Sequence, residues 1–216
     1  MIRHHPDDAT LMAHATGTLA SGVELLTAVH LEGCAHCKAV AREFELVAAT
    51  ILTDQLPAEL APDSFDRLMA RIDEKPAPHA AFRVGSRPRL PAGMDWPRSL
   101  RHCHVSRWHV MGPGMKWSRV RLPYDPTENL VLLRIAAGKC LPPHTHGGVE
   151  LTQVLYGAFD DGRAVFSAGD FDATDCSVHH QPVVQASGEC ICLAALTGRL
   201  MFDSRLARLA GALVGL

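Results

Sequence analysis

The feature that most constrains this chain is a short stretch rich in metal ligands, His30-Leu-Glu-Gly-Cys34-Ala-His-Cys37. In a continuous helix, positions i, i+4 and i+7 lie on one face, so His30, Cys34 and Cys37 would project together. Gly33 weakens the helix here and would let the chain bend around a tetrahedral ion with ligand distances of roughly 2.0 to 2.3 Å. The stretch therefore predicts a zinc site.

A tetrahedral site needs a fourth ligand, and His4 and His5 in the opening Met-Ile-Arg-His-His-Pro are the candidates. Cys34-x2-Cys37 also fits a redox-active pair of the thioredoxin type, or two small buried side chains. A thioredoxin motif follows a strand in a βαβ unit, whereas the pattern around these cysteines is helical. The helical context favours the metal site.

The first third of the chain has a helical pattern. Between residues 7 and 74, apolar residues recur at three- and four-residue spacing, and Gly17 and Gly33 mark helix ends. A further helix is expected at 35–53, and Asp63 is a candidate N-cap for another at 64–72. So small a bundle buries little apolar area, and a structural zinc ion would supply folding free energy that the core lacks.

The rest of the chain changes character. Five prolines and two glycines interrupt residues 75–101, which predicts a linker. Short β-like segments follow, separated by turn residues, at 105–110, 117–122, 129–136, 150–158, 164–167, 180–185 and 190–196. Many short strands at this spacing favour an all-β barrel or sandwich. We expect a helical domain at 1–75, a Pro-rich linker at 76–98 and a β domain at 99–216.

A second group of ligands lies in the β region. His144 and His146 are two residues apart and share a face on an extended strand, and Glu150 can reach the same point from the next segment. A fourth ligand is available downstream at His179 or His180. Three histidines and one glutamate suit Zn, Mn or Fe(II), and the ligand types do not choose among them. The alternative is a barrel that holds no metal.

Charge and composition restrict the partners. Residues 1–75 hold 6 Lys/Arg against 12 Asp/Glu, whereas the remaining residues hold 15 against 11. An acidic first part argues against direct binding of nucleic acid and suits a basic protein partner. No apolar stretch reaches the roughly 20 residues that cross a bilayer, and no leader pattern opens the chain. The seven cysteines are an odd number and fit a reducing compartment, so we expect a cytoplasmic protein without a membrane partner.

The β region resembles the cupin barrels. The spacing of Gly138, His144, His146, Glu150 and Gly157 matches the first cupin motif without a gap. The second motif aligns from Gly169 and puts its histidine on His180 rather than His179. It departs from the family at Asp175, Ser177 and Val184. The resemblance implies a β-barrel or jelly roll whose divalent metal, zinc or another, is held by His144, His146, Glu150 and His180.

The helical region is similar to the zinc-binding anti-sigma domains, which carry His-x3-Cys-x2-Cys and an upstream histidine, here His5. A zinc anti-sigma domain followed by a cupin resembles the ChrR type of anti-sigma factor. The resemblance implies a multidomain α plus all-β protein that inhibits an extracytoplasmic-function-type sigma factor. It also implies that the cupin senses oxidants such as singlet oxygen and triggers release. The partner contacts are expected on the first three helices and on 64–72, which the Pro-rich segments leave free to dock separately.

The rival hypothesis is a mononuclear metal cupin enzyme of the dioxygenase type, with the helices as a docking module. An enzyme needs an open metal position, which four protein ligands restrict. An acidic zinc bundle serves a regulator better than a metabolic enzyme. Cys190 and Cys192, on one face of a late strand, are interpreted as core residues or as a site of oxidation chemistry.

Overall fold

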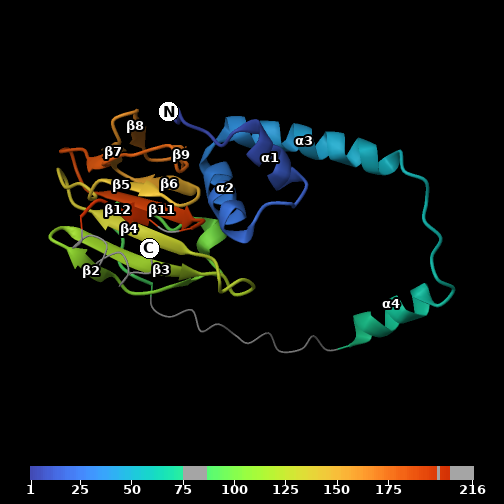
Figure 1. The fold of residues 1–216 in the computed structure, drawn as a ribbon. Helices are drawn as coiled ribbons and strands as arrows, with labels where there is room; N and C mark the ends of the chain where they lie inside the picture. The colour runs from blue at the N-terminus through green and yellow to red at the C-terminus, as the bar shows by residue number, and fades with distance from the viewer. Residues whose placement is uncertain (75–86, 199, 205–216) are drawn as a thin grey trace.

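The protein consists of helices followed by a β-barrel (Figure 1). The computed structural model describes residues 1–74, 87–198 and 200–204. Residues 76–86 of the predicted linker and the last twelve residues of the predicted β domain lie outside the described ranges. Within them the helices are α1 (Asp8–Ala15), α2 (Ser21–Gly33), α3 (Ala35–Thr53), α4 (Ser64–Asp73) and the short η1 (Arg98–Leu100). The predicted α plus all-β fold is confirmed.

The helix break at the cysteines is well defined. Helix α2 ends at Gly33, and Cys34 has extended φ and ψ angles of −103° and 101°. Cys34 then serves as the N-cap of α3, because its Sγ accepts a hydrogen bond from the backbone N–H of Cys37 at 3.4 Å. The expected bend is present, and it places both thiols at the start of α3.

The β region contains twelve short strands in the described residues. They are β1 (His104–Val105), β2 (His109–Gly112), β3 (Met115–Arg121), β4 (Leu130–Ile135), β5 (His144–His146), β6 (Glu150–Tyr156), β7 (Ala158–Asp160), β8 (Val165–Ser167), β9 (Phe171–Thr174), β10 (Val183–Val184), β11 (Cys190–Leu196) and β12 (Leu200–Phe202). The large sheet has the order β1-β3-β4-β11-β6-β9, with β2 paired to β3. The strands β10-β7-β8 and β12-β5 form two smaller sheets.

The large sheet is apolar on both faces because each face is covered. Along β4, Leu130 and Leu132 belong to a cluster that includes Leu26 and Val29 of α2. The alternate residues Val131 and Leu133 belong to a cluster with strand residues on the other face. Successive side chains of a strand point to opposite faces, so α2 covers the outer face and the barrel interior covers the inner one.

The chain before α1 also binds to the barrel. The carboxylate of Asp170 accepts hydrogen bonds from the backbone N–H groups of Arg3 at 2.6 Å and His4 at 3.1 Å. The N–H of Phe171 donates to the carbonyl of His4 at 3.0 Å. Gly169, just before them, has a φ of +95°, and a Cβ there would lie 2.7 Å from Ile2. A glycine is therefore needed where residues 2–4 cross the barrel.

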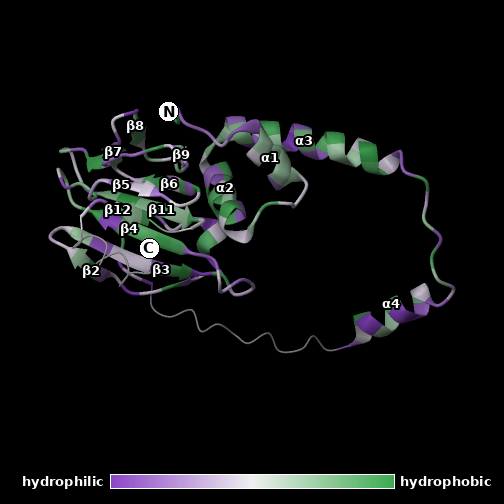
Figure 2. Cartoon of the chain, viewed as in Figure 1, coloured by the Kyte–Doolittle hydropathy of each residue, from purple (hydrophilic) through white to green (hydrophobic). Residues whose placement is uncertain are grey.

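Helix α4 differs from the others because it packs on nothing in the described part of the chain. It contains no buried residue, and Phe65, Leu68, Met69 and Ile72 are exposed. Figures 1 and 2 show α4 apart from the barrel, with hydrophobic residues along it. The helix was predicted at 64–72 and is found there, but the side chain of its N-cap Asp63 makes no capping hydrogen bond. No helix in the described ranges is both long enough and apolar enough to cross a membrane.

Candidate metal centres

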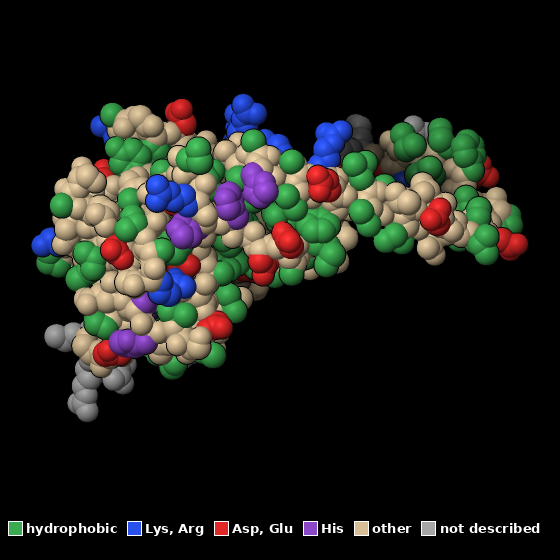
Figure 3. Space-filling view, turned by 90° about the horizontal axis from the view of Figure 1, so that it is seen from above, with side chains coloured by type: hydrophobic (Ala, Val, Ile, Leu, Met, Phe, Trp, Pro, Cys, Tyr) green, Lys and Arg blue, Asp and Glu red, His purple; other side chains and the backbone are tan. Residues whose placement is uncertain are grey.

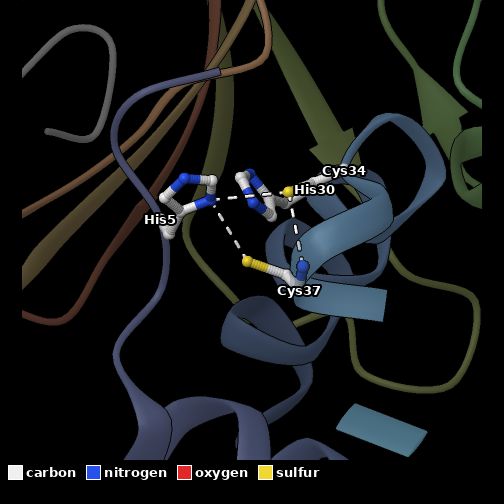
Figure 4. Close-up of side chains that lie close together, drawn as sticks. All are labelled: His5, His30, Cys34 and Cys37. Atoms are coloured by element: carbon white, nitrogen blue, oxygen red, sulfur yellow. Dashed lines mark hydrogen bonds between the residues drawn. The ribbon is translucent and has the colours of Figure 1, made fainter. Parts of the chain in front are cut away.

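The structure brings four predicted ligands together where α2 meets α3 (Figure 4). One nitrogen or sulfur from each of His5, His30, Cys34 and Cys37 lies within 4.8 Å of the others. His5 Nδ1 is 3.4 Å from Cys34 Sγ and 3.2 Å from Cys37 Sγ. His4 instead packs against Phe166, with ring centroids 4.5 Å apart and the rings tilted by 42°. We call this group the helical site.

The spacing of these atoms fits a tetrahedral ion. Ligands at 2.0 to 2.3 Å in a tetrahedron lie roughly 3.3 to 3.8 Å from one another. Of the two sulfur–nitrogen distances, 3.4 Å lies inside that range and 3.2 Å lies just below it. His30 Nε2 is buried without a hydrogen-bond partner, which is costly unless a cation accepts its lone pair. The residues therefore fit the predicted zinc.

The pKa values of His30 and Cys37 are also shifted by their surroundings in ways that bear on metal binding. Burial lowers the pKa of His30, against the opposing effect of the hydrogen bond that its ring shares with the side-chain oxygen of Gln153, and so favours the neutral ring that binds metals. Burial and the neighbouring Cys34 raise the pKa of Cys37 to about 12. The two thiolates that zinc requires would repel each other here unless a cation lay between them.

A second group lies inside the barrel and combines His144, His146, Glu150 and His180, which are all buried. His180 Nε2 lies 3.2 Å from His144 Nε2 and 3.1 Å from His146 Nε2. Glu150 Oε2 lies 4.0 Å from Nε2 of both His144 and His180. His179, the alternative, is exposed and faces Asp203. We call this group the barrel site.

The barrel site also fits a cation. His144 Nδ1 lies 2.8 Å from the carbonyl oxygen of Pro142, which can only accept, so Nδ1 carries the proton and Nε2 is a free lone pair. Burial lowers the pKa values of His146 and His180, so neither ring gains a proton readily. Three imidazole nitrogens and a carboxylate that converge in this way form a set of ligands for a divalent metal.

Two more acidic groups stand behind these ligands. Asp161 Oδ2 is 3.5 Å from His180 Nδ1, and Arg163 pairs with both Asp161 and Asp172. Burial, the nearby Asp161 and Glu150 raise the pKa of Asp172 to about 6, although Arg163 opposes the shift. A positive charge at the barrel site would offset this accumulation of carboxylates.

A cavity of about 40 Å³ adjoins the barrel site. It has room for one or two molecules the size of water. Its wall includes Glu150, Asp172 and the thiols of Cys190 and Cys192, whose sulfur atoms are 3.6 Å apart. The hydrogen bond with Cys190 and burial raise the pKa of Cys192, so this thiol is protonated and a poor nucleophile.

The structure also shows polar residues that the sequence reasoning did not select. They are Gln153, which contacts His30, and Asp161, Arg163 and Asp172 around the barrel site. Gln153 lies in the predicted strand 150–158 next to Thr152 and three residues after Glu150, so a polar side chain does not stand out there. Asp161 lies between β7 and β8, where acidic residues are common, and Asp172 lies on the short strand β9, so the sequence offers no signal for either.

Comparison with known proteins agrees with the fold. The family model described as "ChrR Cupin-like domain" matches residues 97–198. The anti-sigma-E factor ChrR of Cereibacter sphaeroides is 38% identical over 212 residues, which cover 96% of each chain.

A solved structure is similar over most of the chain. The crystal structure of Rhodobacter sphaeroides SigE in complex with the anti-sigma ChrR matches with a TM-score of 0.72 and 34% identity. The match covers 91% of this chain and 100% of that chain. These relatives are regulators, which favours the regulatory hypothesis over the cupin enzyme. The chain belongs to the ChrR family of anti-sigma factors.

Proposed function

We propose that this protein is an anti-sigma factor that binds and inhibits a sigma factor of the extracytoplasmic-function type in the cytoplasm. The observation that carries the proposal is the apolar surface of α3 and α4. Phe65, Leu68, Met69 and Ile72 follow i, i+3, i+4 and i+7 spacing, so they form one stripe on α4. Their exposed fractions range from 43% to 70%. An amphipathic helix with its apolar face uncovered is suited to bind a partner.

Helix α3 carries a second exposed apolar surface. Its first half packs against the helical site, where Cys37 and Ala41 are buried. Its second half exposes Leu46, Val47, Ile51 and Leu52, each with an exposed fraction above 55%. Figure 3 shows hydrophobic side chains, with acidic ones among them, on the side of the molecule where α3 and α4 lie.

Charge supports the choice of partner. Residues 35–74 contain 8 Asp/Glu and 4 Lys/Arg. A negative rim around an apolar surface attracts a partner with basic groups and speeds its association. Sigma factors bind DNA and so carry basic surfaces, and the relative of known structure is in complex with one.

The two metal groups have different roles in this proposal. Zinc at the helical site is structural, since four protein ligands leave no open position, and it holds α2, α3 and residues 2–5 together. The barrel site, with zinc or another divalent metal, responds to oxidants such as singlet oxygen, because it borders a cavity large enough for a small oxidant. Oxidation of a ligand or loss of the metal would then weaken partner binding.

The test is reconstitution with a candidate sigma factor. The full chain should form a stoichiometric complex with it and inhibit transcription in vitro. Phe65→Asp with Leu68→Asp should weaken binding by at least 100-fold, because it places charges in the apolar contact. A matched control, Val110→Asp, changes a side chain that is 77% exposed on β2. Equal binding by the double variant and the control would refute the assignment of the surface.

A further inference from the structure

The four ligands of the helical site all come from residues 5–37, but a distant part of the chain helps to position them. Its cysteines belong to the α2–α3 junction, whereas both histidines are held by the barrel. His5 follows residues 3 and 4, which bind Asp170 and Phe171 on the barrel. His30 Nδ1 lies 3.1 Å from Oε1 of Gln153 on β6. The barrel therefore places two of the four ligands.

The contact between Gln153 and His30 has a defined direction. Gln153 is only 2% exposed, and its side-chain N–H donates to the carbonyl of Val154 at 3.0 Å. This bond fixes the amide so that the oxygen faces His30. An amide oxygen can only accept, so His30 Nδ1 must carry the proton and donate it. The lone pair of His30 is then on Nε2, the buried atom that lacks a hydrogen-bond partner.

Strand β6 also contributes to the barrel site. Glu150 and Gln153 are three residues apart on β6, and side chains three apart on a strand point to opposite faces. Glu150 faces the barrel interior and Gln153 faces α2. Phe171, the partner of Gln153 in the neighbouring strand β9, lies edge-on to the His30 ring at 5.9 Å between centroids. Two adjacent strands thus fix the orientation of His30.

We propose that Gln153 is a positioning residue of the helical site, which holds His30 in the Nδ1–H form so that Nε2 binds the metal. The inference rests on the metal site named in the proposed function. Residues that orient a metal-bound histidine typically change metal affinity by about 10- to 100-fold when they are replaced. Through Gln153 the metal affinity of the helical site depends on the geometry of β6, and hence on the barrel.

The first test is cobalt binding by the full chain in competition with a chelator. Of the two groups of ligands, only the helical site includes cysteines, so the sulfur-to-cobalt charge-transfer band reports that site. Gln153→Met keeps the length of the side chain and removes the acceptor, and it should weaken cobalt binding by about 10- to 100-fold. Gln153→Glu keeps an acceptor and should stay within about threefold of the wild type. Gln55→Met, an exposed glutamine beyond α3, is the control and should have no effect.

The outcomes separate the possibilities. Equal affinity of Gln153→Met and the control overturns the inference while leaving the metal site intact. Equal weakening in Gln153→Met and Gln153→Glu also overturns it, because the role would then be packing alone. A wild-type chain without the charge-transfer band overturns this inference and the zinc assignment together.

The second test needs no variant and so does not depend on the folding of Gln153→Met. In zinc-loaded protein with ¹⁵N-labelled histidine, NMR should show a protonated Nδ1 and a metal-bound Nε2 for His30. His5, whose Nδ1 faces the thiols, should show the opposite pattern. A deprotonated Nδ1 in His30 would overturn the inference.

Discussion

Replacement of Leu26 tests whether the helices and the barrel unfold together. Leu26 lies on α2, is 0% exposed and belongs to the same apolar cluster as Leu130, Leu132 and Leu193 of the large sheet. Leu26→Ala removes three carbons from this helix–sheet contact. If the contact holds the two parts together, the substitution destabilises both.

The size of the effect follows from burial. Three buried carbons contribute about 2.4 kcal/mol by transfer from water, at about 0.8 kcal/mol each. The cavity left behind adds to this, and fully buried leucines typically lose about 3 to 4 kcal/mol on truncation. A loss of about 3 kcal/mol lowers the folding equilibrium constant by more than 100-fold.

Two optical probes report the two parts of the chain separately. The three tryptophans all lie outside α1 to α4: Trp117 is on β3, Trp108 lies just before β2, and Trp96 precedes η1, so their fluorescence reports the part of the chain that follows these helices. Circular dichroism at 222 nm reports the helices. In urea unfolding of the metal-loaded protein, both midpoints should fall together in Leu26→Ala. The control, Leu46→Ala, changes a residue that is 61% exposed and should stay within about 0.5 kcal/mol of the wild type.

A shift of the helical transition alone would refute this reasoning. It would mean that the cluster between α2 and the large sheet does not couple the two parts, and that the expected domains at 1–75 and 99–216 unfold independently. The predicted domain boundaries remain a prediction until this is measured.

Three further substitutions or treatments test other contacts. Asp170→Asn should lower the unfolding free energy by about 1 to 3 kcal/mol in a urea titration, because an amide nitrogen replaces one of the two carboxylate oxygens that accept backbone N–H groups. A change below about 0.5 kcal/mol would contradict this. Burial tends to raise the pKa of Asp170, but hydrogen bonds from Arg3, Ser167 and His4 lower it overall. The stabilisation by this carboxylate is therefore present above about pH 4 and is lost as the pH falls through the lowered pKa. Asp170→Asn should reduce this pH dependence of the unfolding free energy. Gly169→Ala should lower the melting temperature by several degrees, because a Cβ at a φ of +95° is strained and meets Ile2. The control is Gly188→Ala, where a Cβ has open space. Equal melting temperatures of the two variants would refute the argument. Removal of metal by a chelator should lower the urea midpoint followed by circular dichroism at 222 nm, and addition of zinc should restore it. A Cys37→Ser variant that unfolds like the metal-loaded wild type would contradict a structural ion.

Local patterns predicted the helices well. Helix α3 was expected at 35–53 and occurs there, because apolar spacing, a proline-free run and the break at Gly33 all act within a few residues. The sequence also predicted two ligand spacings, His30-x3-Cys34-x2-Cys37 and His144-x-His146-x3-Glu150. The first set spans eight residues at the junction of two helices, and the second spans seven residues on two neighbouring strand segments. The four-residue groups that the sequence proposed are the two that the structure brings together.

Features that depend on distant contacts were not predicted. Strands β5, β9 and β12 have only three or four residues, too few for an alternating pattern to stand out. The segment 105–110 proved to be two strands, β1 and β2, which both pair with β3. Gln153 was missed because its partner His30 is 123 residues away, and single-sequence patterns carry no information about such pairs.

The arrangement also limits how the barrel can act on a bound partner. A change at the barrel site alters partner affinity only if it alters contacts that differ between the bound and free states. Helix α2 and residues 2–5 contact the barrel directly, and α3 is joined to them through Cys34 and Cys37. Helix α4 contributes to none of the buried clusters of the described residues, and its apolar stripe is exposed without any contact to the barrel. An oxidant signal would therefore reach the α3 part of the binding surface and leave the α4 part unchanged, so a partner released from α3 would still be tethered by α4.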